Sequence, residues 1–202
     1  MISRRDIIAA AGAVAAVAAP AAGRGQVPQA VRRTVGEGGL VYTVVYDDRY
    51  SEGIRFAGQA NSLGYRTRAI SGDVTSLWYD DLYHRWKKGP AAIAGLTTVD
   101  AAMCLGMFAA DAGMRCVFEA EHRFEDGETE IGHRVRAPAG WSTIRALETC
   151  GEQWPELLPR LMGACPVAPA KSEAVHVAAA PARAALDRPT MVSWVFAPIR
   201  RS

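Results

Sequence analysis

The chain has 202 residues, of which 50% are hydrophobic and 22% charged, and this size and composition predict one ordinary globular domain and exclude a disordered chain. Its 23 Lys and Arg nearly balance its 21 Asp and Glu, so the formal net charge is only +2, which argues against a nucleic-acid-binding protein that works through a basic face. Four cysteines in this length are too few for a small disulfide scaffold.

The first residues have the pattern of an export signal. Arg4 and Arg5 follow Ser3, two large apolar residues come after Asp6, and no charged residue occurs from Ile7 to Gly23. The small residues around Ala21 suit a signal peptidase, so we expect cleavage near that position. A retained membrane anchor is the alternative, but the uncharged stretch is short and rich in alanine, which favours cleavage over a stable anchor.

This segment resembles the twin-arginine (Tat) export signal of bacteria. The resemblance implies a signal peptide over residues 1–21, a periplasmic location and an interaction with the Tat export machinery. That pathway carries proteins that fold before export, and many of its passengers hold a redox cofactor or travel with a partner that does. The resemblance covers the leader alone and names no family for the mature domain.

Residues 22–39 are rich in Gly, Gln, Arg and Pro and predict a flexible lead-in to a single α/β domain over residues 40–202. Strand and helix patterns then alternate up to residue 118. The expected strands are 40–46, 65–70, 90–96 and 114–118, and the expected helices between them are 51–63, 75–88 and 98–112. This alternation is typical of βαβ crossovers and predicts a mostly parallel sheet in a Rossmann-like three-layer arrangement.

An antiparallel hairpin is expected near residues 116–136. Asp126-Gly127 lies between two alternating runs, which is a strong hairpin signal. A two-residue loop there would place Arg123 opposite Glu130 and Glu119 opposite Arg134, so that opposite charges face each other on one side of the ribbon.

The last third of the chain is less regular. Residues 141–152 look helical, and Pro155 fits the first turn of another helix. Residues 166–189 predict a long connection, with a short strand or helix possible around His176. Residues 191–196 form a final apolar run that we expect to rejoin the sheet.

Polar side chains gather where the predicted parallel strands end. Ligands bind beyond the carboxyl ends of strands in open parallel sheets, so these loops are the expected ligand site, although capping of the following helices explains the same residue types. The candidate ligand-binding residues are Asp47, Asp48, Ser71, Asp73, Thr97 and Thr98.

His122 and His133 are the most specific polar feature, because both lie on the otherwise apolar side of the predicted hairpin. They are candidate catalytic residues that would act together as an acid–base pair. Asp47 is a further candidate catalytic residue. The alternative is a pair of core-edge histidines with local partners. Two histidines do not complete a metal site, so no metal is predicted.

Other signals of chemistry are missing from the sequence. It has no phosphate-binding glycine loop, no G-x-S-x-G nucleophile motif and no haem or iron–sulfur spacing. We therefore expect no tightly bound cofactor. Export permits disulfides, and Cys150 with Cys165 is the preferred pair, whereas Cys104 and Cys116 are either bonded or buried thiols.

Two functions fit these patterns. The chain is an accessory or small subunit of a larger, cofactor-bearing periplasmic redox enzyme, a reading that the surplus of aromatic residues between Trp78 and Trp86 supports. Alternatively it binds or transforms a small polar molecule at the strand ends. Neither reading involves nucleic acid.

Overall fold

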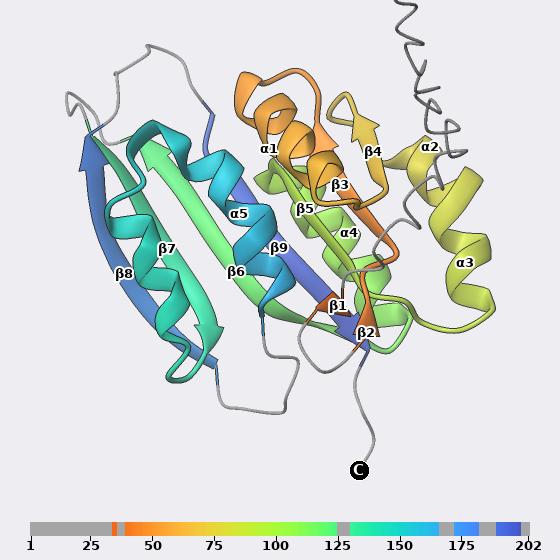
Figure 1. Ribbon diagram of the computed structural model, residues 1–202. Helices are drawn as coiled ribbons and strands as arrows, with labels where there is room; N and C mark the ends of the chain where they lie inside the picture. Colours follow the sequence, from red (N-terminus) through yellow and green to blue (C-terminus); the bar gives the residue numbers. More distant parts are fainter. Residues whose placement is uncertain (1–33, 36–38, 125–129, 166–171, 182–188, 199–202) are drawn as a thin grey trace, which may run out of the picture.

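The computed structural model describes residues 34–35, 39–124, 130–165, 172–181 and 189–198. It contains one large mixed sheet with helices packed on its faces (Figure 1). The strand order across this sheet is β4-β3-β5-β9-β6-β7-β8. The strands are β3 (Thr43–Asp47), β4 (Thr67–Ile70), β5 (Ile93–Thr98), β6 (Met114–Phe124), β7 (Glu130–Pro138), β8 (Ser172–Pro181) and β9 (Met191–Pro198).

The helices occur close to the predicted positions. They are α1 (Ser51–Ser62), α2 (Thr75–Leu77), the π-helical segment η2 (Trp78–Leu82), α3 (Tyr83–Lys87), α4 (Val99–Asp111), the 3₁₀ segments η3 (Ser142–Glu148) and η4 (Gly151–Gln153), and α5 (Trp154–Gly163). Two short strands, β1 (Thr34–Val35) and β2 (Gly39–Leu40), pair with each other within and just after the expected lead-in. The predicted leader lies outside the described residues.

The prediction of a mostly parallel, Rossmann-like sheet was wrong. Among the described strands, the parallel pairs are limited to those of β3 with β4 on one side and β5 on the other. The final strand β9 lies between β5 and β6 and is antiparallel to both. β6 therefore runs in the same direction as β5, as a βαβ crossover requires. Because β9 lies between them, however, β6 pairs with an antiparallel neighbour, and β7 and β8 continue the antiparallel pairing.

Helices cover the two faces of the sheet separately. On one face, α1 and α5 pack on each other and on the sheet. On the other face, α4 and the helical segment 75–87 form a second hydrophobic core with Val45, Ile93 and Trp194. The βαβ part of the chain is thus three layers thick.

β9 belongs to both cores, because alternate side chains of a strand point to opposite faces. Trp194 and Phe196 lie in the core beneath α4, whereas Val195 and Ala197 lie in the core beneath α5. Residues 191–197 are all buried. The apolar run was therefore correctly predicted to rejoin the sheet, and its burial on both faces explains why it does not alternate with polar residues.

The predicted hairpin is confirmed as β6 and β7, but its register is different. Glu119 pairs with Arg136 and Glu121 with Arg134, a shift of two residues from the expected pairs. A shift of two keeps every side chain on its expected face, so the apolar and charged sides remain as predicted. The loop with Asp126 and Gly127 lies outside the described residues.

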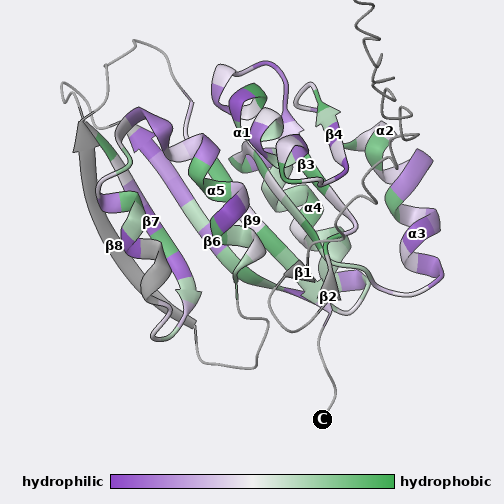
Figure 2. Ribbon diagram, viewed as in Figure 1, coloured by the Kyte–Doolittle hydropathy of each residue, from purple (hydrophilic) through white to green (hydrophobic). Residues whose placement is uncertain are grey.

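The antiparallel part of the sheet has a polar face opposite α5. Figure 2 shows hydrophilic and hydrophobic residues alternating along β6 and β7. Glu119 lies 4.0 Å from Arg136 and Glu121 lies 3.4 Å from Arg123, and all four side chains are partly or largely exposed. Among the residues that the structure describes, no helix is long and apolar enough to cross a membrane.

Gly53 and Gly58 make a matched test of how tightly α1 sits on β3. A Cβ at Gly53 would lie 2.1 Å from the backbone oxygen of Asp47, whereas a Cβ at Gly58 meets nothing within 4 Å. We expect Gly53→Ala to lower the free energy of unfolding by about 1–3 kcal/mol through overpacking. Gly58→Ala should raise it by up to about 1 kcal/mol, since alanine favours a helix interior. Urea denaturation of both variants checks this; equal effects would contradict the packing.

Candidate functional site

The carboxyl ends of β3 and β5 form a topological switch point. After β3 the chain enters α1 on one face of the sheet, and after β5 it enters α4 on the opposite face. Because the connecting helices diverge here, this is where open α/β sheets most often bind ligands. Asp47 ends β3 and Thr97 lies near the end of β5, so the structure brings these predicted residues to one edge.

Asp47 is held by a neighbouring arginine that the sequence analysis did not include. The Arg49 side chain donates through Nε at 2.9 Å and through Nη2 at 2.7 Å, and its backbone N–H donates at 3.2 Å. The carboxylate is fully buried, whereas 44% of the Arg49 side chain is exposed. Pairing with Asp47 raises the pKa of Arg49. A bidentate pair of this kind neutralises the buried charge and orients the guanidinium.

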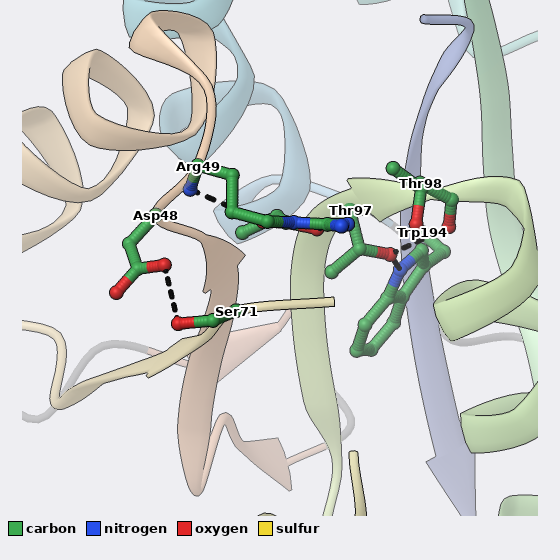
Figure 3. A network of polar contacts seen from close by, with 7 residues as sticks. Asp48, Arg49, Ser71, Thr97, Thr98 and Trp194 are labelled. Carbon is green, nitrogen blue, oxygen red and sulfur yellow. Dashed lines mark hydrogen bonds and ion pairs between the residues drawn. The ribbon is translucent and has the colours of Figure 1, made fainter. Parts of the chain in front are cut away.

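The Arg49 side chain extends from the end of β3 toward the end of β5, where Thr97 lies (Figure 3). It passes Gly72, whose φ is +85° and where a Cβ would lie 2.4 Å from the guanidinium carbon. Nearby, Ser71 donates a hydrogen bond to Asp48 at 2.8 Å. Because Gly72 has no side chain, the loop after β4 leaves room for the Arg49 guanidinium.

The other predicted residues have structural partners. Asp73 accepts a hydrogen bond from the backbone of Thr75 at 2.8 Å, and hydrogen bonding with Thr75 lowers the pKa of its carboxyl. Thr97 Oγ1 accepts from the indole N–H of Trp194 at 3.1 Å and donates to the Thr98 carbonyl at 3.2 Å. Thr98 occupies the N-cap position of α4, but its side chain makes no capping hydrogen bond. These groups organise the strand ends, where Asp48, Arg49 and Asp73 are the exposed charged residues.

His122 and His133 lie directly opposite each other on β6 and β7. Their Nδ1 atoms are 2.7 Å apart, and His122 Nε2 lies 2.8 Å from the Ser193 hydroxyl on β9. The ring of His122 stacks on Trp154 of α5 at 4.2 Å. Both imidazoles and the serine are buried. A lone serine in an otherwise apolar strand was the sequence signal for this third member.

The ring protons of this cluster are tightly constrained. The hydrogen bond between the two Nδ1 atoms requires one ring to donate and the other to accept. His133 Nε2 has no hydrogen-bond partner within the described part of the chain. Burial lowers the pKa of His133 to about 4, and burial together with His133 lowers the pKa of His122 well below its usual value. Both rings are therefore neutral at pH 7. Their hydrogen bond and the stacking on Trp154 suit them to fix how β6, β7 and α5 pack together.

The described residues contain no group of three or more His, Cys, Asp or Glu side chains arranged to hold a metal ion. The expected Cys150–Cys165 disulfide is not formed, and Cys104 and Cys116 are likewise thiols. Cys150 Sγ donates to the Leu147 carbonyl at 3.3 Å, and burial raises the pKa of Cys165 to about 12. Such a thiol is a poor nucleophile and packs as a small apolar group.

A scan against protein-family models, a search of curated proteins and a search of solved structures each found no match to this chain. The fold defines the class, an α/β protein with a mixed sheet. What the protein does must be inferred from its surfaces and sites.

The histidine pair predicts a pH-dependent stability. In the unfolded chain these rings take up protons near pH 6.5, whereas burial holds His133 neutral down to about pH 4. The unfolded state therefore binds more protons between these values, and stability falls as the pH drops from about 6.5 to about 4. We expect His133→Gln to reduce this slope by up to about 1.4 kcal/mol per pH unit. Thermal melts across this range provide the measurement.

The exposed His84 supplies the control. His84→Gln is the matched substitution, because it removes a histidine from the surface helix α3 and leaves the buried pair intact. A slope that is the same in His133→Gln and the unsubstituted chain would show that the buried pair does not titrate in this way.

Proposed function

We propose that the protein is an exported periplasmic accessory subunit that docks on a larger, cofactor-bearing redox enzyme. The observation that carries the proposal is an exposed apolar ridge on α4, formed by Val99, Met103 and Met107. Their exposed fractions are 47%, 60% and 54%. Residues four apart lie on one face of a helix, so these side chains form a continuous row.

The ridge is unusual for a surface helix. The buried side of α4 is already occupied by Ala101, Leu105 and Ala109, which pack on the sheet. A second apolar side has no role in that core and remains in contact with water. Methionine side chains are flexible and polarisable, and they are common at protein-binding surfaces.

The surroundings of the ridge define the partner it fits. Asp100 and Asp111 are exposed near the two ends of α4. A matching surface would offer an apolar groove with cationic groups at its ends. On one side the helix is held firmly, because Phe108 stacks on Trp78 with ring centroids 4.2 Å apart. The surplus aromatic residues of the sequence thus brace α4, and Tyr79 adds an exposed ring, 62% accessible, on the adjacent η2.

The alternative function, binding of a small polar molecule at the strand ends, has weaker support. Asp47, Asp73 and Thr97 are each engaged by groups of the same chain. The Arg49 guanidinium, 44% exposed, and the exposed carboxylate of Asp48 are the charged groups that face solvent at that edge. Location and redox association rest on the leader, which lies outside the described residues and resembles a twin-arginine signal.

Charged substitutions on the ridge test the docking. Met103→Lys with Met107→Lys should lower the recovery of the partner from native periplasm at least about tenfold, because a buried charge removes a central apolar contact. The measurement is affinity purification of the tagged chain, with quantitative mass spectrometry and an absorbance spectrum. The captured partner must be stoichiometric and carry a chromophore.

Ile54→Lys is the matched control, because Ile54 is equally exposed, at 56%, but lies on α1. It should retain the partner. Recovery of the unsubstituted chain alone, or equal recovery with both variants, would contradict docking through α4.

The export step has its own test. Substitution of Arg4 and Arg5 by lysine should leave the uncleaved precursor in the cytoplasm, since the twin-arginine pathway reads this pair. Immunoblots of cytoplasmic and periplasmic fractions measure the distribution. Undiminished appearance of the cleaved chain in the periplasm would exclude this export route.

A further inference from the structure

A second polar cluster lies at the opposite edge of the sheet from Asp47 and Thr97, where β3 and β4 begin. It consists of Tyr42, Arg66, Arg68, Asp81 and Arg85, and we refer to it as the arginine cluster. Its members come from the start of β3, the start of β4, η2 and α3. No motif in the sequence marks this cluster, because its members are far apart in the chain.

Asp81 is the centre of the arginine cluster. Its side chain is 8% exposed and accepts hydrogen bonds from the Tyr42 hydroxyl at 2.5 Å and from Arg66 Nη2 at 2.8 Å. Arg68 Nε lies 3.7 Å from the same carboxylate. Asp81 lies in the π-helical segment η2. π-helical turns are rare and occur frequently at functional sites.

Aromatic contacts fix the arginines further. The Arg66 and Arg85 guanidinium carbons lie 5.0 Å and 5.2 Å from the centre of the Tyr42 ring. Arg66 also donates to the Tyr42 hydroxyl at 2.8 Å, and Arg85 donates to the Gly89 carbonyl at 2.9 Å. Two guanidinium groups are thereby held in place before any ligand arrives, which lowers the entropy lost on binding.

The arginine cluster has surplus positive charge. The cluster contains three guanidinium groups and one buried carboxylate, which contacts Arg66 and Arg68. The exposed Asp80 next to Asp81 in the chain does not balance the difference. Arg66 and Arg68 are 49% and 41% exposed. Within the described residues, no hydrogen bond engages the terminal amino groups of Arg68. The cluster therefore presents oriented N–H donors to solvent, with net positive charge behind them.

We propose that the arginine cluster is a binding site for the oxyanion group, phosphate or carboxylate, of a small molecule. Planar guanidinium groups pair with such oxyanions through two parallel hydrogen bonds. Asp81 and Tyr42 position Arg66, and Arg68 is the arginine with donors available for the ligand. This site is independent of the α4 ridge and does not rest on docking to a partner.

Binding of simple anions to the full chain tests the proposal. Inorganic phosphate and succinate are the probes, at low ionic strength, with sodium chloride at matched ionic strength as the reference. We expect at least one probe to raise the melting temperature above the chloride reference. Titration calorimetry then gives its affinity, which should fall as chloride is added because the attraction is screened.

Variants of Arg68 decide whether the arginine cluster is responsible. Arg68→Gln should weaken binding about tenfold, since it removes a charge-assisted hydrogen-bond pair. Arg68→Lys should have an intermediate effect, because it keeps the charge and loses the planar fork. Arg123→Gln is the control on the polar face of β6, where Arg123 is 59% exposed, and it should bind as the unsubstituted chain does.

The responses to the two anions and to Arg68→Gln together decide whether the arginine cluster binds oxyanions. A response to phosphate or to succinate that Arg68→Gln weakens supports the site, and the preferred probe assigns the oxyanion. Equal melting shifts in phosphate, succinate and chloride would overturn the proposal. So would an affinity that Arg68→Gln leaves unchanged.

Discussion

The placement of β9 in the middle of the sheet is the constraint on which the rest of the structure depends. It is the common neighbour of β5 and β6 and joins the parallel part of the sheet to the antiparallel part. Its side chains complete both hydrophobic cores, and Ser193 and Trp194 provide partners for His122 and Thr97. Both polar features predicted from the sequence therefore depend on a strand far away in the chain.

Local patterns predicted the elements of this fold but not their arrangement. The helices α1 and α4 and the strand after each could be located because helical periodicity and capping residues act over a few positions. The apolar run of residues 191–196 is consistent with any strand buried on both faces. Nothing in its own composition shows that it lies between β5 and β6, because this pairing is decided by contacts across the whole domain. The mostly parallel sheet was wrong for this reason.

The candidate site shows the same division. The positions of Asp47 and Thr97 at one edge could be predicted, since parallel strands place their carboxyl ends together. Their engagement by Arg49 and Trp194 could not, because it depends on side-chain directions. The hairpin was predicted with the correct faces, but its register is shifted by two residues. Asp81 was beyond prediction, since a π-helical turn changes which residues face inward along an otherwise ordinary helix.

The position of β9 also constrains the order of events during synthesis. Every other described strand of the large sheet leaves the ribosome before it, yet the two parts of the sheet cannot join until it is present. The nascent chain therefore carries two incomplete cores, with apolar strand edges exposed, until synthesis is almost finished. A process that requires the folded chain would have to wait for this last strand. A chaperone bound to the open strand edges would protect the chain during that interval.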